Sequence, residues 1–309
     1  MSEQRAEILL PTYNGARYIR EQIDSILAQT DGRWHLTLSD DGSTDGTQAI
    51  LDEYAQQYPD KIARYRSGRR FGNARDHFFH LMQRCDAPYM LFCDQDDVWY
   101  PQKVGRTMDA LLAAEAEGGK DTPVLVFSDQ RVTDEQLRPL SDSLAQYQRH
   151  YTDHFDYRSL LMQNVVTGGA MGINRALAKL GGNCVDPSQT IMHDWWLAAV
   201  AARFGKVVYL PEPLGDYRQH GDNEVGAKNV TSAAYVARRL SNLADVKKTI
   251  RIKKLQAAVF LKTYAASLGA EDNRFLQGFV RERSGALFCW RYRRLVHGLW
   301  RFAGMLILG

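Results

Sequence analysis

The sequence has few cysteines, no long apolar run and no internal repeat, and each absence argues against a class of protein or of binding site. Its four cysteines are scattered without Cys-x-x-Cys spacing, which argues for a reducing compartment and against a disulfide framework or a structural zinc site. No apolar stretch approaches the roughly 20 residues that a membrane span requires. The first residues are polar, and the apolar run at 8–10 is too short for the core of a signal peptide, so we expect no such peptide.

Charge is distributed unevenly along a chain of otherwise ordinary composition. Its 309 residues suffice for one large domain or two modest ones. The net charge is +3, but residues 231–309 carry 15 Lys and Arg against 4 Asp and Glu, an excess of 11 that leaves the remainder at −8. The C-terminal region should therefore favour an anionic partner such as lipid headgroups, nucleic acid or an acidic polymer.

The first 130 residues alternate between strand-like and helix-like segments. Short strand-forming runs are predicted at 7–10, 34–39, 62–66, 89–93 and 124–127. Helices with one apolar face are predicted at 16–29, 47–58, 73–84 and 101–117. This alternation with short loops predicts a right-handed, mostly parallel α/β layer fold. The polar ends of the strands should then gather at one edge of the sheet, where ligands bind.

The rest of the chain is less regular. We expect a loop with helical pieces at 131–158, an extended segment with close backbone approach at its glycines at 164–173, and a helix at 194–204. Two short strands are expected at 207–210 and 214–217, on either side of two prolines. Beyond residue 229 no strand pattern remains, and two or three helices are predicted at 233–266, 274–283 and 285–308.

Three carboxylates follow the predicted strand at 89–93. Asp94, Asp96 and Asp97 would repel one another unless a cation lies among them or one of them holds a proton. Asp94 and Asp96 would face the same side of an extended chain. Hard oxygen ligands suit Mg²⁺ or Mn²⁺ paired with substrate phosphates, so a metal–diphosphate site is one interpretation. An acidic turn before a helix at Pro101, capped by Asp97, explains the same residues without a ligand.

Polar residues also follow the first two predicted strands. Thr12, Tyr13 and Asn14 offer backbone amides and an aromatic face that suit a nucleotide, although an ordinary turn at Asn14 is the commoner explanation. A carboxylate of Asp40 or Asp41 can accept the imino N–H of a pyrimidine ring. The residues after them are those expected in a turn and a helix cap.

Five segments, taken in order, resemble the family 2 inverting glycosyltransferases of the GT-A fold. They are LPTYNG at 10–15, SDDGSTDGT at 39–47, DQDDVW at 94–99, HDWW at 193–196 and YRQHGDN at 217–223. The last segment and the Asp-Gln-Asp-Asp-x-Trp form are most similar to bacterial rhamnosyltransferases of cell-surface polysaccharide synthesis. The chain departs from the family pattern in two places. His193 stands where glutamate is frequent, and arginines flank Gly72 where asparagines are common.

The resemblance implies a role for each residue of these segments. The nucleotide would contact Pro11, Thr12, Tyr13, Asn14, Asp40, Asp41, Arg75, Asp94 and Gln95. Asp96, with Asp94 and His220, would hold Mg²⁺ or Mn²⁺, which helps the nucleoside diphosphate to leave. Arg218 and His220 would meet the diphosphate. Asp194 would take the proton of the acceptor hydroxyl. The acceptor and the transferred sugar would be lined by His193, Trp195, Trp196, Asp97, Gly168 and Gly169.

The resemblance also implies a domain organisation and a reaction. Residues 1–229 would form the GT-A catalytic domain, with a nucleotide-binding half at about 1–129 and an acceptor half at about 130–229, followed by a basic, amphipathic helical region at 230–309. The donor would be dTDP-L-rhamnose and the acceptor a lipopolysaccharide or lipid-linked glycan. Arginines interleaved with large apolar residues near the C-terminus suit a helix in the membrane interface, so we expect a cytoplasmic enzyme at the inner face of the bacterial membrane. Packing of these helices on the catalytic domain or on another copy is the alternative.

Three other functions fit parts of this pattern. The same chemistry could use a UDP-hexose or UDP-N-acetylhexosamine donor. A nucleotidyltransferase on a similar fold would need a Gly-rich, Arg-containing loop after the first strand, which Pro11 to Asn14 is not. A non-catalytic basic protein could bind membrane or nucleic acid through its C-terminal region. The presence of three strand-end carboxylates together with Asp194 argues against it, and we expect no nucleic acid partner.

Overall fold

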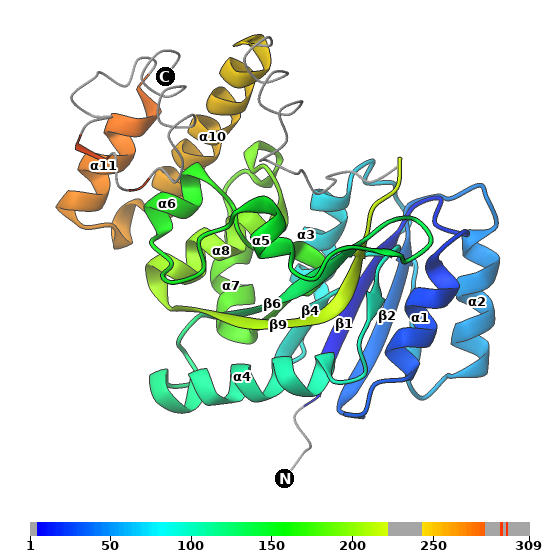
Figure 1. Cartoon of the computed structure of the whole chain (residues 1–309). Coiled ribbons are helices and arrows are strands. Elements are labelled where there is room, and N and C mark those ends of the chain that lie inside the picture. The colour runs from blue at the N-terminus through cyan, green and yellow to red at the C-terminus, as the bar shows by residue number, and fades with distance from the viewer. Residues whose placement is uncertain (1–4, 222–242, 282–290, 293–294, 296–309) are drawn as a thin grey trace.

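A computed structural model describes residues 5–221, 243–281, 291–292 and 295, and its centre is a nine-stranded sheet (Figure 1). The strands are β1 (Ala6–Thr12), β2 (Trp34–Asp40), β3 (Ile62–Tyr65), β4 (Tyr89–Phe92), β5 (Val98–Trp99), β6 (Val124–Thr133), β7 (Pro139–Ser141), β8 (Met171–Asn174) and β9 (Lys206–Arg218). They follow the order β3-β2-β1-β4-β8-β6-β9-β5, and β7 pairs with β6. The predicted α/β fold is confirmed. The N-terminal strands are parallel, whereas β8 lies antiparallel between β4 and β6.

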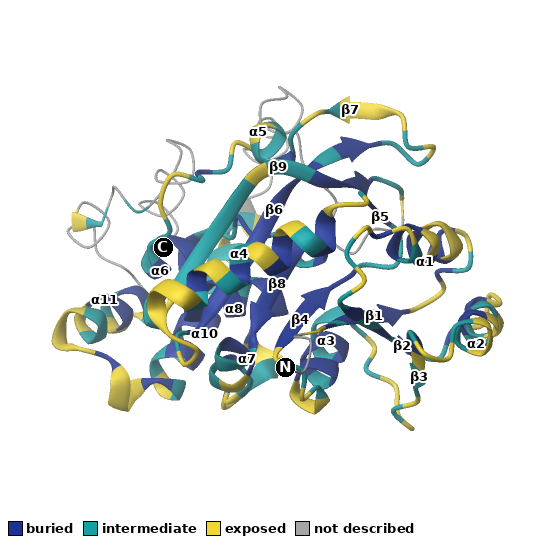
Figure 2. Ribbon diagram, turned by 90° about the horizontal axis from the view of Figure 1, so that it is seen from below, coloured by how far each residue is buried: buried dark blue, intermediate teal, exposed yellow. Residues whose placement is uncertain are grey.

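Helices cover both faces of this sheet. They are α1 (Ile19–Leu27), α2 (Thr47–Gln57), α3 (Ala74–Arg84), α4 (Lys103–Gly118), α5 (Leu144–Gln148), α6 (Tyr157–Met162), α7 (Arg175–Gly182), α8 (His193–Phe204), α10 (Leu243–Thr263) and α11 (Ala270–Val280). Three short 3-10 turns are η1 (Gly168–Ala170), η2 (Pro187–Gln189) and η3 (Ala265–Ser267). Seen from below, β1, β4 and β6 are mostly buried, much of β9 is intermediate, β7 is exposed, and α4 crosses the sheet with its outer side exposed (Figure 2).

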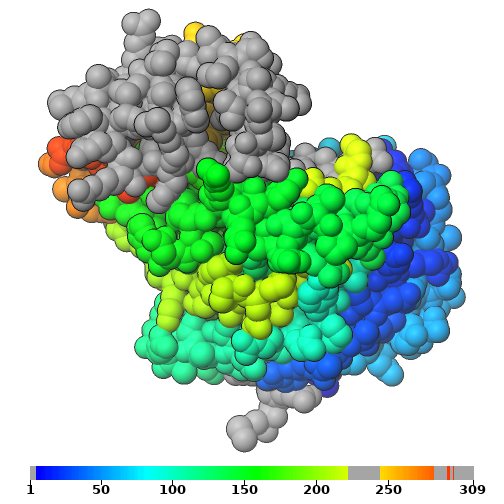
Figure 3. All heavy atoms as spheres, viewed as in Figure 1, coloured from blue at the N-terminus to red at the C-terminus, as the bar shows by residue number. Residues whose placement is uncertain are grey.

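Alternate residues of each strand feed two separate cores, as expected for side chains that point to opposite faces of a sheet. Ile8 and Leu10 of β1 pack with residues of α1, α2 and α4. Leu9 and the β4 residue Phe92 pack on the other face with residues of α3, α7 and α8. Figure 3 shows the segment that follows β6 as a green band across the molecule, between the blue N-terminal elements and the C-terminal part.

The strand register brings the polar strand ends level with one another. Thr12 pairs with Asp40 across β1 and β2, and Leu9 pairs with Phe92 across β1 and β4. The residues after Phe92 therefore come level with Thr12 and Tyr13. The predicted gathering of these segments at one edge of the sheet follows directly from this register.

Several predicted boundaries are wrong in the second half of the chain. β6 continues past Asp129 to Thr133, and β9 is one long strand where two short ones were expected. Pro211 and Pro213 are tolerated because the pairing of β9 with β6 shifts register between Ser128 and Asp129, and prolines lack the N–H that a regular ladder needs. Helix α7 and the short strand β7 were not predicted.

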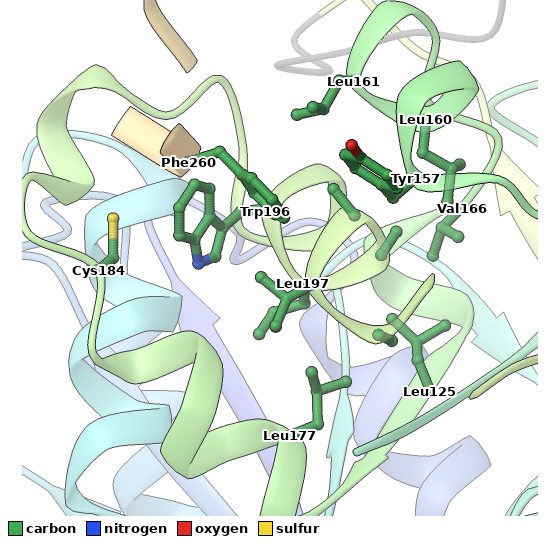
Figure 4. Close-up of a cluster of buried hydrophobic side chains, with 14 of the residues drawn as sticks. Leu125, Tyr157, Leu160, Leu161, Val166, Leu177, Cys184, Trp196, Leu197 and Phe260 are labelled. Atoms are coloured by element: carbon green, nitrogen blue, oxygen red, sulfur yellow. The ribbon is translucent and has the colours of Figure 1, made fainter. Parts of the chain in front are cut away.

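The C-terminal helices share the core of the α/β domain. Trp196 of α8 packs against Phe260 of α10 with ring centroids 5.7 Å apart and stacks on Tyr264 at 5.8 Å. Figure 4 shows Trp196, Phe260 and Tyr157 converging above Leu197 and Leu177. Figure 1 places α10 and α11 at the opposite end of the molecule from α1 and α2. The structure therefore supports the alternative that these helices pack on the catalytic domain.

Two expectations for the C-terminal region fall largely on residues whose structure is not described. The proposed boundary near residue 229 lies outside the described residues, as does the interfacial helix expected at 285–308 apart from residues 291, 292 and 295. Within the described ranges, no helix has the length and apolar character needed to cross a bilayer.

Phe260 tests whether α10 belongs to the main core. Phe260→Ala should lower the free energy of unfolding by about 3–5 kcal/mol, because it removes a fully buried ring between α8 and α6. Leu255→Ala on the same helix should change it by less than about 0.5 kcal/mol, since Leu255 is exposed. Urea denaturation followed by circular dichroism measures both, and equal effects would contradict the shared core.

Candidate active site

A cleft of about 1130 Å³ opens at the carboxyl ends of the first strands. One wall comes from strand-end residues, among them Tyr13, Asp41 and Asp96. The opposite wall comes from the start of α8, including Asp194, and from α10. The predicted residues that line this cleft are Pro11, Thr12, Tyr13, Asp41, Asp94, Gln95, Asp96, Gly168, His193, Asp194 and Trp195.

Hydrogen bonds tie the three strand ends into one surface. The Thr12 hydroxyl donates to Asp40 Oδ1 at 2.9 Å, and the Asp41 amide donates to the Thr12 carbonyl at 2.8 Å. The Gln95 side chain makes two hydrogen bonds to the backbone of Tyr13: it accepts from the amide at 2.9 Å and donates to the carbonyl at 3.1 Å. Tyr13 is left half-exposed, with its ring available at the cleft.

Asp40 and Asp41 have different surroundings. The Asp40 carboxylate accepts from the amides of Gly42 and Ser43 at 2.9 and 2.8 Å, so it organises the turn. Asp41 is buried and lines the cleft, but its two oxygens accept from the amides of Phe71 and Gly72. Of the two carboxylates, Asp41 is therefore the one at the cleft. Asn14 faces the same turn rather than the cleft, because its side-chain oxygen accepts from the Thr44 amide.

Asp96 and His220 meet, as the predicted metal role requires of two ligands. His220 Nε2 lies 2.7 Å from Asp96 Oδ2, and both side chains are largely buried. The His220 ring packs on Tyr18 at 4.6 Å. A carboxylate oxygen and an imidazole nitrogen suit a divalent cation. However, no cluster of three or more His, Cys, Asp or Glu side chains arranged for a metal occurs in the part of the chain that is described.

Arg218 is buried among protein partners rather than directed at a ligand. Its Nε donates to the Asp96 carbonyl at 2.9 Å, one terminal nitrogen donates to the Glu135 carbonyl at 3.0 Å, and the other pairs with Glu21. Its backbone amide donates to Asp97 Oδ1 at 3.2 Å. The expected diphosphate contact is therefore not the arrangement seen, and Arg218 instead positions the loop of Asp96.

A buried lysine, Lys103, offsets part of the negative charge of the acidic segment 94–97 from the interior of the domain. Lys103 is 1% exposed, its Nζ donates to the Gly169 carbonyl at 3.0 Å, and it lies over the Trp99 ring at 4.6 Å. Asp97 is also 1% exposed and accepts from Gln130. Burial raises the pKa of Asp97, and the neighbouring Asp96 carboxylate adds to this, while burial lowers the pKa of Lys103. Asp97 thus supports the site from beneath and does not line it as expected for a sugar contact.

Gly168 and Gly169 allow the backbone to pass close to acidic side chains. A Cβ at Gly169 would lie 2.6 Å from Asp94 Oδ2 and 3.1 Å from Asp97 Oδ2, well inside contact distance. A Cβ at Gly168 would lie 3.1 Å from His193 Nε2. The predicted close approach at these glycines is confirmed, and their role is to let η1 fit between Asp94 and α8.

Asp194 is a buried carboxyl at the cleft. It is 8% exposed, and burial raises its pKa to about 7 against the lowering effect of hydrogen bonds. Asn164 Nδ2 donates to its Oδ2 at 3.1 Å and the Trp195 amide donates to its Oδ1 at 2.6 Å. A carboxyl with a pKa near neutrality can both accept and release a proton under physiological conditions.

His193 occupies an apolar slot beside Asp194. Its ring lies 4.1 Å from that of Phe78 and 5.2 Å from that of Phe92, and neither ring nitrogen has a hydrogen-bond partner among the described residues. Burial lowers the pKa of His193 to about 3, so the ring is neutral. It therefore acts as a packing element at the lining of the cleft, next to Asp194.

Two other predicted contacts lie away from the cleft. Arg75 donates to the carbonyls of Ser188 and Thr190 at 2.8 Å and pairs with Asp76, so it fastens α3 to η2 rather than binding a nucleotide. Trp196 is fully buried and donates to the Gly181 carbonyl at 2.9 Å, so it is a core residue rather than a sugar platform. Only Trp195 of the two indoles lines the cleft.

Comparison with known proteins decides the family. Residues 7–181 match the family model "Glycosyl transferase family 2", which spans more than half of the chain. The chain belongs to glycosyltransferase family 2. A dTDP-rhamnosyl transferase of Shigella flexneri, RfbG, is similar at 28% identity over 290 residues, which cover 92% of this chain and 94% of that protein.

Solved structures of low sequence identity have the same fold. TarS 1-349 from S. aureus in complex with UDP superposes with a TM-score of 0.57 at 15% identity, over 97% of this chain and 88% of that chain. The mannosyltransferase PcManGT from Pyrobaculum calidifontis, in complex with GDP-Man and Mn2+, superposes with a TM-score of 0.54 at 15% identity, over 97% and 85% of the two chains. The glycosyltransferase therefore has the GT-A fold with added C-terminal helices, as predicted.

Some residues of the glycosyltransferase site were not predicted. Lys103 and Asn164 lie outside the motifs. They belong to the site because Lys103 is buried near Asp97 and Asn164 donates a hydrogen bond to Asp194. Thr249 and Lys253 reach the cleft from α10, which was treated as a separate region. A signal for Lys103 exists in the sequence, because it lies in the first turn of a helix that starts directly after the acidic segment.

Substitution of Lys103 tests whether its positive charge stabilises the buried carboxylate of Asp97. Lys103→Met should lower the free energy of unfolding by about 3 kcal/mol, because it removes the buried positive charge that offsets the desolvation of Asp97. Lys61 is a matched control: its Nζ also donates to a glycine carbonyl, that of Gly32, and lies over Trp34 at 4.6 Å, but this contact is exposed. Urea denaturation at pH 7 should show a much smaller loss for Lys61→Met, and similar losses would refute a specific role for Lys103.

Proposed function

We propose that this glycosyltransferase moves a sugar to a hydroxyl of a lipopolysaccharide or another lipid-linked glycan by a metal-assisted single displacement that inverts the anomeric centre. The donor we favour is dTDP-L-rhamnose. The observation that carries the proposal is the buried Asp194 carboxyl, which shares one cleft with the strand-end residues Tyr13, Asp41 and Asp96. The similarity to RfbG supports the choice of donor.

Asp194 is the base in this mechanism. The acceptor oxygen attacks the anomeric carbon, the bond from that carbon to the diphosphate oxygen breaks, and the hydroxyl proton passes to Asp194. Burial makes Asp194 a stronger base than an exposed aspartate while leaving it largely ionised above about pH 7. Asn164 and the Trp195 amide hold the carboxylate in place, and the neighbouring His193 ring is neutral.

The strand-end surface is the proposed nucleotide site. The Tyr13 ring, held by Gln95, offers an aromatic face, and Asp41 lies at the same end of the cleft. Asp96 and His220, with Asp94, would hold Mg²⁺ or Mn²⁺, which when bound supplies positive charge to the departing diphosphate. The Mn2+ and GDP-Man in the PcManGT complex support this assignment.

The remaining parts of the proposal concern the nucleobase of the donor, the roles of the domains and the contact with the membrane. The UDP and UDP-GlcNAc complexes of TarS favour a UDP-sugar as the second candidate donor. Residues 1–129 would bind the nucleotide, 130–229 would contact the acceptor, and the basic region 230–309 would lie against the anionic inner face of the cytoplasmic membrane. Lys247, Lys248 and Arg251, exposed on α10, support the last point.

Removal of the Asp194 carboxylate should abolish transfer without unfolding the protein. In a transfer assay with dTDP-L-rhamnose and a lipid-linked acceptor, Asp194→Asn should reduce kcat about 10²–10⁴-fold, because no group takes the hydroxyl proton. The wild-type rate should rise with pH through about 7 and level off above it, since the ionised carboxylate is the active form.

Stability separates this effect from misfolding. The raised pKa means that the folded protein loses stability as pH rises from the ordinary value of 3.8 to about 7, and the full cost is present above that pH. Asp194→Asn removes that cost, so at pH 8 the variant should unfold at the wild-type temperature or above. Asp156→Asn, which keeps the helix cap of α6 outside the cleft, should retain wild-type kcat. Retention of more than a tenth of the activity by Asp194→Asn would rule out Asp194 as the base.

A further inference from the structure

A buried tyrosine, Tyr18, lies outside the hydrophobic cores of the domain. It is 7% exposed, yet it belongs to none of the three clusters of buried apolar side chains in the described part of the chain. It directly precedes α1, and it is not among the residues that line the cleft. Contacts other than core packing or the cleft must therefore account for its burial.

Tyr18 contacts two residues at the C-terminal end of β9. Its ring centroid lies 4.6 Å from that of His220, and the Arg218 guanidinium lies over the same ring at 4.8 Å. A guanidinium over an aromatic face is an attractive contact, and it is stronger when both groups are removed from water. Tyr18 and Arg218 are both buried, so one ring holds the two side chains that end this strand.

Glu135, in the connection between β6 and β7, closes these contacts into a network. The Tyr18 hydroxyl donates to Glu135 Oε1 at 2.6 Å, and the Glu135 carbonyl accepts from Arg218 at 3.0 Å. Arg17 pairs with the same carboxylate from the more exposed side. The tyrosine is therefore held at its hydroxyl end as well as by its place before α1.

Strand pairing reaches only the residues before His220. The ladder between β6 and β9 includes the pair Thr133 and Arg218, and the Gln219 amide then donates to the Thr133 carbonyl at 2.9 Å. His220 comes one residue later, and its Nε2 lies 2.7 Å from Asp96 Oδ2. The orientation of its ring therefore depends on side-chain contacts, and the Tyr18 ring supplies one of them.

The first turn of α1 also contacts both ends of the loop that carries Asp96. Glu21 pairs with Arg218, whose Nε donates to the Asp96 carbonyl at 2.9 Å. Gln22 is fully buried and donates to Cys93 Sγ at 2.7 Å, at the residue before the acidic segment. The start of α1 thus faces both sequence segments that meet where Asp96 contacts the histidine after β9.

We propose that Tyr18 is a positioning residue that, with Glu135, holds the His220 ring against Asp96 and so presets the pair that would bind the metal. Substitution of residues that orient metal ligands commonly weakens metal binding about 10–100-fold. This inference rests on the proposed function, which assigns the metal to Asp96 and His220. It goes beyond that function because it gives a residue outside the cleft a role in the geometry of the metal site.

Mn²⁺ binding to the full chain, saturated with dTDP, tests this role. Continuous-wave EPR of free Mn²⁺ gives the dissociation constant, and pulsed EPR detects the nitrogen of an imidazole bound to the ion. Tyr18→Leu should weaken Mn²⁺ binding about tenfold and reduce the nitrogen signal, which His220→Gln should abolish. Tyr18→Phe keeps the ring but not the hydroxyl, so its affinity should lie between those of Tyr18→Leu and the wild type. Binding of dTDP without metal should be the same in all of them.

Tyr54 of α2 is a matched control. Its hydroxyl also donates to a carboxylate, Asp24 Oδ1 at 2.6 Å, and the Arg20 guanidinium lies over its ring at 5.8 Å. It is buried to the same degree as Tyr18, but it belongs to the core that contains residues of α1, α2 and α4. Tyr54→Leu should therefore lower the melting temperature and leave the affinity for Mn²⁺ at the wild-type value.

The outcomes separate this inference from the proposed function. If Asp96→Ala loses Mn²⁺ but Tyr18→Leu keeps the wild-type affinity and nitrogen signal, the positioning role is refuted and the metal site stands. If Tyr18→Leu and Tyr54→Leu weaken Mn²⁺ binding equally, the effect is general destabilisation and the role is again refuted. If the wild type with dTDP binds no Mn²⁺, or binds it without an imidazole nitrogen signal, the proposed metal site fails and the positioning role with it.

Discussion

Desolvation of carboxylates at one edge of the sheet is the constraint on which the rest of the structure depends. Strand register delivers Asp94, Asp96 and Asp97 to the same edge, where burial and the neighbouring Asp96 carboxylate raise the pKa of Asp97. Lys103 compensates them from beneath, Arg218 orders their loop through the Asp96 carbonyl and the Asp97 carboxylate, and His220 contacts Asp96 directly. The opposite side of the cleft supplies one more buried carboxyl, Asp194, without any cation in hydrogen-bond contact among the described residues.

Helix α8 links this chemistry to the C-terminal helices. Its first turn carries Asp194 and Trp195 into the cleft, while Trp196 points the other way into the core shared with α10. The same packing that stabilises α10 therefore positions Asp194 and brings Lys253 to the cleft beside Trp195. Helix α10 is thus both a part of the core and a part of the cleft wall.

The sequence predicted best what depends on local pattern. Tyr13, Asp41, Asp94 and Asp194 follow recognisable strand ends or begin a helix, so their meeting at one cleft followed from the α/β fold. Prediction from the sequence failed for residues whose role depends on tertiary packing. Trp195 and Trp196 are adjacent, and only their orientation on α8 separates a cleft residue from a core residue. Arginine is a residue type that often binds phosphate. Arg218 is instead buried against Glu21 and two backbone carbonyls, where it positions the loop of Asp96.

Nucleotide-dependent thermal stabilisation tests the central claim most directly, that the carboxylate edge binds a metal–nucleotide pair. Melting temperatures are measured with dTDP, UDP or GDP, each with and without Mn²⁺, for the wild type and for Asp96→Ala. A ligand that binds only the folded state raises its stability by mass action. We expect dTDP with Mn²⁺ to give the largest shift in the wild type and none in Asp96→Ala. No shift with any nucleotide, under conditions where a control transferase responds, would contradict it.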